Sequence, residues 1–249
     1  ASASGLEKYI QLSVLFSPGG ALDTAVRTLA HEAEKELGQK IVIQNLPNGG
    51  GMMGVARLAG EKNDGMHIAA SVTNALIFIP YCTETPYHPL TDVEPLLIFG
   101  QASPVLVTRP DAEWKNMDEF LSAARGNKKM RIGVPGLGTP SHIALAMMAS
   151  KDPDLNWRFI PFGGPGEAEA ALLGGHIDAA ASGALPRIKN AQLRPLMVLS
   201  SSRLPALPDT PALSDKGFPD TGEGDSCFIL LAPARTPETH LQRLELAFT

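Results

Sequence analysis

The sequence predicts an α/β protein with two lobes, each built on a mostly parallel sheet flanked by helices. Three observations predict this class. Apolar segments with the period of a strand alternate along the chain with segments of helical period. A strand followed by a glycine-rich turn and a helix occurs twice in closely similar form. The 249 residues are also enough for two lobes of ordinary domain size.

Composition and charge limit the classes of partner. The chain is 44% hydrophobic and 19% charged, with a mean hydropathy of +0.01, as is typical of globular proteins. A net charge of −5 gives no general attraction for nucleic acid or for an anionic membrane. No stretch approaches the roughly 20 apolar residues of a membrane span. We therefore expect no nucleic-acid partner, and an anionic ligand must be held by local groups.

The first strand–turn–helix unit opens the chain. Residues 10–16 alternate apolar and other side chains, which is the period of a strand. Residues 17–20, Ser-Pro-Gly-Gly, interrupt the pattern, and a helical period begins at Leu22. Gly38 stands at a typical helix C-cap, and residues 40–45 form a second strand. This βαβ order predicts a parallel sheet.

The same order of elements continues to residue 249. We expect helices at residues 52–61, at 117–125 with Asn116 as cap, at 142–151 and up to 173, and a last helix opened by Thr236 and Pro237. The expected strands are residues 66–73, 96–108 with a break at 101–103, 130–134, 159–162, 177–181, 196–200 and 227–232. The chain is expected to cross between lobes near Gln101 and near Gly224. The predicted lobes are therefore residues 1–101 with 224–249, and residues 102–223.

The second strand–turn–helix unit carries the sequence PGLGTPS at residues 135–141, after the strand that ends at Val134. Such a turn presents unpaired backbone N–H groups at the positive end of a helix dipole, and this favours an anion. A single glycine-rich turn is more often only a tight turn. Two matched turns at the carboxyl ends of strands favour a ligand site.

Catalytic motifs are incomplete in this sequence. Residues 49–54 match the G-x-G-x-x-G fingerprint, but they follow the second strand of their unit and no acidic residue lies about 20 positions on. Val55 stands where a P-loop needs lysine, and Lys35 replaces the second histidine of a zinc motif begun at His31. We therefore expect a binding protein and not an enzyme, with no catalytic residue, no metal and no cofactor.

The two cysteines leave two interpretations open. Cys82 and Cys227 either form a disulfide or remain buried free thiols, since both have apolar neighbours. So low a cysteine count fits the cytoplasm as well as a periplasmic protein without disulfides. The small polar residues 1–5 look like a mature N-terminus after signal removal or like a short added segment.

A set of segments in a fixed order carries a family resemblance. The segments are residues 16–23, 37–39, 42–47, 49–54, 86–90, 133–136 with Ser141 and His142, 161–164, 172–178, 204–211 and 230–237. No one of them is diagnostic, but together they span nearly the whole chain. In this order they resemble the solute receptors of tripartite tricarboxylate transporters, the Bug-type periplasmic binding proteins.

The resemblance implies a type II-like periplasmic-binding-protein fold whose two lobes close over a ligand in the cleft between them. The ligand would be a small organic acid, either a dicarboxylate or tricarboxylate or an aromatic carboxylate, delivered to the membrane permease subunits of the transporter. We expect a monomer in the periplasm, and the resemblance implies further helix and strand after Thr249 to complete the first lobe. Carboxylate sensing for signalling is a second hypothesis, and a nucleotide-dependent enzyme is a third.

The resemblance also assigns ligand contacts by position. They are Phe16, Ser17, Gly19, Gly20 and Asp23 or Thr24 in the first turn, Asn74 after the third strand, Gly136, Gly138, Thr139, Ser141 and His142 in the second turn, and Phe162, Gly163 and Gly164 on the far wall. His142 either contacts the ligand or bonds to its own loop. Ser182 is the nearest polar residue where family members usually carry an acid that can hold an amino group, so a plain carboxylate is expected rather than an amino acid.

Overall fold

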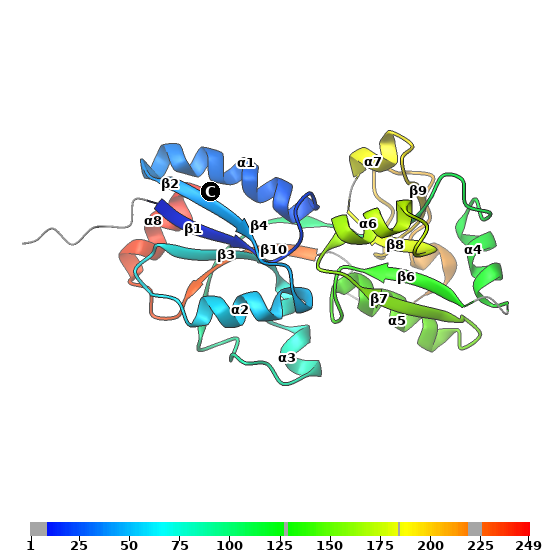
Figure 1. Cartoon of the computed structure of the whole chain (residues 1–249), viewed down its shortest axis with the longest axis horizontal. Coiled ribbons are helices and arrows are strands. Elements are labelled where there is room, and N and C mark those ends of the chain that lie inside the picture. The colour runs from blue at the N-terminus through cyan, green and yellow to red at the C-terminus, as the bar shows by residue number, and fades with distance from the viewer. Residues whose placement is uncertain (1–8, 127–128, 184, 219–225) are drawn as a thin grey trace, which may run out of the picture. The chain divides into compact units, whose positions relative to one another are not determined.

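The computed structural model describes residues 9–126, 129–183, 185–218 and 226–249 (Figure 1). The chain divides into two compact units, residues 1–100 with 227–249, and residues 101–226. Both divisions fall inside strands, β4 (Val93–Ala102) and β10 (Ser226–Pro233), which are neighbours in one sheet. The crossing expected near Gly224 lies outside the described residues, so the lobe boundaries stay a prediction.

The first unit is built on a mixed five-stranded sheet in the order β2-β1-β3-β10-β4. β1 (Tyr9–Val14) runs parallel to β2 (Lys40–Asn45) and to β3 (His67–Val72), and β10 runs antiparallel to β3. The carboxyl ends of β1, β2 and β3 therefore lie at the same edge, where the first predicted turn begins.

Helices cover both faces of this sheet. α1 (Ala21–Leu37) lies on one face beside α8 (Glu238–Phe248), and α2 (Met52–Ala59) lies on the other (Figure 1). The alternation in β1 explains this arrangement: Ile10, Leu12 and Val14 are fully buried, whereas the intervening side chains face α2. α1 ends as predicted at Gly38, whose φ of 60° is left-handed. The short α3 (Phe78–Cys82) was not predicted.

The second unit is built on another mixed sheet, in the order β7-β6-β8-β5-β9. Its strands are β5 (Val105–Thr108), β6 (Met130–Val134), β7 (Trp157–Pro161), β8 (Ala179–Ser182) and β9 (Arg194–Val198). β6 is parallel to β7 and β8, whereas β5 is antiparallel to β8 and β9. Of the parallel pairs, β6 and β7 are connected by one helix, α5, as the sequence predicts.

Two hydrophobic cores lie on the two faces of the second sheet. One packs α4 (Met117–Ala124) and α5 (Pro140–Lys151) against β6, and the other packs α6 (Pro165–Leu173) and α7 (Leu185–Lys189) against β5 and β8. Neighbouring residues in a strand serve opposite cores: Leu106 belongs to the first and Val105 to the second. α7 was not predicted, and the expected break at residues 101–103 falls instead at 103–104.

The α/β class is confirmed, and both sheets are mixed. Both cysteines are free; Cys82 is exposed and Cys227 half-buried, so the expectation of buried thiols is wrong for Cys82. Within the described residues, no helix has the length and apolar character needed to cross a membrane.

Candidate ligand-binding turns

Three strand-to-helix turns of this chain are closed in the same way. In each, the backbone N–H of a glycine just before the helix donates to the side chain four residues on, in the first turn of that helix. The pairs are Gly19 with Asp23 Oδ2 at 3.0 Å before α1, Gly138 with His142 Nδ1 at 3.2 Å before α5, and Gly163 with Glu167 Oε2 at 3.0 Å before α6. The following N–H groups of each helix have no intrahelical acceptor, and in the described part of the chain no N-cap side chain bonds to them.

Asp23 closes the first turn from inside the protein. Its buried carboxylate accepts hydrogen bonds from Gly19 N–H, from Arg27 Nε at 3.0 and 3.1 Å and from Asn45 Nδ2 at 2.9 Å. Burial alone would raise the pKa of this carboxyl, but the hydrogen bonds from Arg27, Gly19 and Asn45 hold it below its usual value. The Asp23 carboxylate thus holds the loop between β1 and α1 in place.

The other predicted residues of the first turn differ in exposure. Phe16 and Ser17 are buried at 5% and 1% exposure, whereas Gly19 and Thr24 are exposed. The Thr24 hydroxyl donates to Gly20 O at 3.0 Å within the helix. Asn45, at the end of β2, also donates to Phe16 O at 3.0 Å. Asn45 was missed by the sequence analysis, although a polar residue ending a strand beside this turn was a usable signal.

Three loops converge where β1, β2 and β3 end. A Cβ added to Gly51, whose φ is +98°, would lie 2.9 Å from Ser71 Oγ, 3.5 Å from Ala75 Cβ and 3.7 Å from Phe16 Cε2. Only glycine fits there, because the space is filled and the φ is left-handed. Asn74 lies in the third loop at 1% exposure, and its Nδ2 donates to Gly50 O at 3.3 Å. Asn74 and Phe16 thus both lie against the loop at Gly50 and Gly51, and contact of either with a ligand stays a prediction.

The second turn presents two buried hydroxyls. Gly136 and Gly138 have φ values of +132° and +76°, and they lead into Thr139, the N-cap residue of α5. Thr139 Oγ1 donates to Gly136 O at 2.8 Å, and Ser141 Oγ lies 3.4 Å from Thr139 Oγ1. Thr139 and Ser141 are 3% and 2% exposed. The N-terminus of α5 therefore places a buried serine hydroxyl beside free backbone N–H groups.

His142 is bonded to its own loop. Its Nδ1 accepts from Gly138 N–H, which requires a ring unprotonated at Nδ1, and its ring packs edge-on against Phe159 with centroids 4.8 Å apart. Burial lowers the pKa of His142 below its usual value. Of the two roles left open by the sequence, this geometry supports the loop-bonding one.

Phe162, Gly163 and Gly164 form the third turn, at the end of β7. Phe162 is half-buried, its N–H donates to Val134 O at 2.9 Å, and its ring lies 3.2 Å from the position of an added Cβ on Gly133. Gly164 is the N-cap residue of α6. The second and third turns are thus joined through β6 and β7, which run parallel side by side.

Ser182 is joined to a buried acid that the sequence analysis missed. Its hydroxyl donates to Glu169 Oε1 at 2.5 Å, and Glu169 Oε2 lies 3.0 Å from Arg187 Nη1. Glu169 is 2% exposed and comes from α6, not from the strand where the family acid was sought. Its position three residues before Leu172, on the buried face of the helix, was the available signal.

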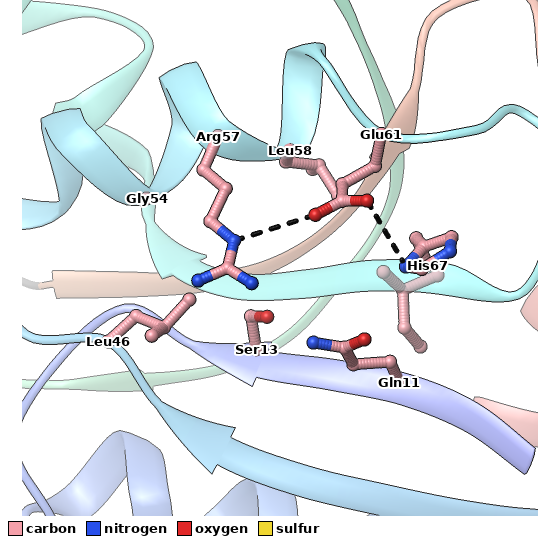
Figure 2. A pocket seen from close by; sticks show the side chains of 9 residues that line it. Gln11, Ser13, Leu46, Gly54, Arg57, Leu58, Glu61 and His67 are labelled. Carbon is pink, nitrogen blue, oxygen red and sulfur yellow. Dashed lines mark hydrogen bonds and ion pairs between the residues drawn. The ribbon is translucent and has the colours of Figure 1, made fainter.

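A small surface pocket elsewhere in the first unit lies between α2 and the sheet (Figure 2). It is lined by Gln11, Ser13, Leu46, Gly54, Arg57, Leu58, Glu61, His67 and Ile68, none of which is a predicted contact. Glu61 links Arg57 Nε at 3.5 Å with His67 Nδ1 at 3.7 Å. Over the described ranges, no three His, Cys, Asp or Glu side chains are grouped to hold a metal ion.

Comparison with known proteins identifies the family of this chain. The family model described as tripartite tricarboxylate transporter family receptor matches residues 25–249. The UPF0065 protein in the gbd 5′ region of Cupriavidus necator is 30% identical over 245 residues, which are 97% of this chain and 74% of that protein.

Two solved structures have the same fold. The periplasmic binding protein BugD is 25% identical with a TM-score of 0.89, covering 98% of this chain and 82% of its own. MatC from Rhodopseudomonas palustris, solved with bound malate, is 25% identical with a TM-score of 0.86, covering 96% of this chain and 83% of its own. Fold and sequence therefore agree, and the chain belongs to the family of tripartite tricarboxylate transporter receptors.

Proposed function

We propose that this chain is a periplasmic solute-binding protein that captures a small organic carboxylate and delivers it to the permease subunits of a tripartite tricarboxylate-type transporter. The observation that carries the proposal is the shared geometry of the glycine-rich turns before α1 and α5. Each presents free helix N-terminal N–H groups at the carboxyl end of a parallel strand. Family membership and the malate held by MatC support the same ligand class.

In this proposal the two units, with boundaries near residues 101 and 224, close over the acid as a clamp. The first turn contributes backbone N–H groups and Ser17, and the second contributes those of α5 with the Ser141 hydroxyl. Neutral donors suffice, since a hydrogen bond to a charged group contributes about 1.5–3 kcal/mol. Four to six of them support a micromolar dissociation constant after the costs of association. Asp23 and His142 hold the turns rather than touching the ligand.

Delivery to a permease requires a separate test. The ligand-loaded protein is mixed with membrane vesicles that contain the transporter's two permease subunits, and uptake of the radiolabelled acid is measured. The proposal predicts uptake that depends on this protein and saturates with it. Tight ligand binding with no protein-dependent uptake would contradict the transport role while leaving carboxylate binding intact.

Size-exclusion chromatography with light scattering should give the mass of one chain, because we propose a monomer.

A further inference from the structure

Asn74 leaves one buried acceptor unused. The residue is 1% exposed, and its Oδ1 has no hydrogen-bond partner among the described residues. A buried polar atom without a partner costs about 1–3 kcal/mol, so such atoms are rare in folded proteins. The atom stands at the loop cluster with Phe16 and Gly51 that we assign to the ligand.

The orientation of this amide is fixed by its other contact. Gly50 O can only accept a hydrogen bond, so the amide group 3.3 Å from it must be the Nδ2 donor. Oδ1 consequently points away from Gly50. The backbone of the next residue, Ala75, is held as well, because its carbonyl oxygen accepts a hydrogen bond from the Tyr87 hydroxyl. Burial raises the pKa of Tyr87 to about 12, which keeps that donor protonated. Rotation cannot satisfy the oxygen without breaking the contact with Gly50.

We propose that Asn74 Oδ1 accepts a hydrogen bond from a hydroxyl group of the ligand, so that the protein selects hydroxy acids over the corresponding plain acids. This rests on the proposed function, because it names a feature of the acid held at the same site. This acceptor discriminates between a hydroxy acid and the corresponding plain acid, because an acid without the hydroxyl leaves Asn74 Oδ1 buried and unpaired.

A hydroxyl fits better than an ammonium group. A buried ammonium needs a free carboxylate beside it. The two buried carboxylates near the predicted contacts are already engaged, Asp23 by Gly19, Arg27 and Asn45, and Glu169 by Ser182 and Arg187. A neutral hydroxyl needs only one acceptor, which Asn74 provides.

The test uses matched acids that differ by one group. Isothermal titration calorimetry of the whole chain compares malate with succinate, citrate with propane-1,2,3-tricarboxylate, and lactate with propionate. In each pair whose carbon skeleton binds, the hydroxy acid should bind about tenfold more tightly, which corresponds to about 1.4 kcal/mol. Asn74→Ala should reduce that ratio to within about twofold. Asn48→Ala, at an exposed asparagine of the neighbouring loop, should leave it unchanged.

Equal affinities within every binding pair, or a tenfold ratio that persists in Asn74→Ala, would overturn the inference and leave carboxylate binding standing. Tighter binding of aspartate than of malate would overturn the choice of a hydroxyl. If no acid of any pair binds, this inference fails, and the proposed function fails with it only if a wider range of carboxylates, aromatic acids included, does not bind either. Asn74→Leu, which keeps the size of the side chain and removes its acceptor, replaces Asn74→Ala if circular dichroism shows that the alanine variant is unfolded.

Discussion

Thr139 and Ser141 lie two residues apart at the start of α5, but their hydroxyl groups donate to different acceptors. The proton of Thr139 goes to Gly136 O at 2.8 Å. Ser141 Oγ lies 3.4 Å from Thr139 Oγ1, a long contact that a better acceptor can displace. Ser141 is therefore the hydroxyl that we expect to donate to the ligand carboxylate.

Ser141→Ala should weaken carboxylate binding about tenfold, because one hydrogen bond to a charged group is lost. Titration calorimetry with the best-binding acid measures the change. Ser150→Ala, an exposed serine near the other end of the same helix, is the matched control and should bind as the wild type does. An unchanged dissociation constant in Ser141→Ala would remove Ser141 from the site.

His142 makes stability depend on pH. Its pKa is lowered by burial, so between pH 6.5 and that lowered value the unfolded chain binds a proton that the folded chain does not. The contribution of His142 is therefore complete above about pH 6.5 and is lost as pH falls through this window. Protonation at Nδ1 also removes the acceptor for Gly138 N–H.

The free energy of unfolding, measured by urea denaturation from pH 7.5 down to pH 5, should thus fall more steeply in the wild type than in His142→Gln. The glutamine oxygen can accept the same hydrogen bond without titrating. Parallel slopes in the two proteins would mean that His142 is not linked to folding in this range.

At the scale of single residues, the sequence predicts where a polar group lies better than what it bonds to. Asp23 and Ser182 were expected to contact a ligand, but each bonds to groups distant in the chain, Asp23 to Asn45 and Ser182 to Glu169. Such partners come from packing of separate elements, which local patterns do not encode. His142 and Gly138 are four residues apart, and there the local interpretation was available.

At the scale of elements, the alternation of apolar residues predicted β2 and β6 with their observed ends. Turn and cap residues predicted the helix C-cap at Gly38 and the helix N-cap at Asn116, whose side chain accepts from Glu119 N–H at 2.9 Å. The short helices α3 and α7 were missed because five residues are too few for the helical spacing of apolar residues to repeat. The predicted parallel direction holds for β1 with β2 and for β6 with β7, each pair connected by a single helix. The antiparallel placement of β5 and β10 depends on long-range pairing.

A substitution at Gly51 tests whether the loops that follow β1, β2 and β3 converge as described. Gly51→Ala should reduce the free energy of unfolding by about 1–3 kcal/mol, because the φ of +98° strains an alanine and its Cβ would lie 2.9 Å from Ser71 Oγ. Gly60→Ala is the control: φ is −93° and the nearest atom to the added Cβ is 3.6 Å away. Equal stability of the two variants by chemical denaturation would contradict the packing at Gly51.

At the scale of the whole molecule, the chain passes between its two units within β4 and β10, which pair side by side. The net charge of −5 opposes an anionic ligand in general, so affinity must come from the local donors of the turns. Neutral donors carry no net charge to be screened. The dissociation constant should therefore change less than about threefold between 50 and 500 mM NaCl, as measured by titration calorimetry. A loss of tenfold or more would indicate a cationic side chain in the site.

A thermal-shift screen against monocarboxylates, dicarboxylates, tricarboxylates and aromatic acids, with amino acids as a separate arm, tests carboxylate binding most directly. A ligand at 100 times its dissociation constant adds about 2.7 kcal/mol to the stability of the folded state. For a protein of this size the melting temperature should then rise by roughly 5–10 °C with one class of carboxylate. A folded protein whose melting temperature moves with none of these acids would contradict the assignment of the glycine-rich turns as a carboxylate site.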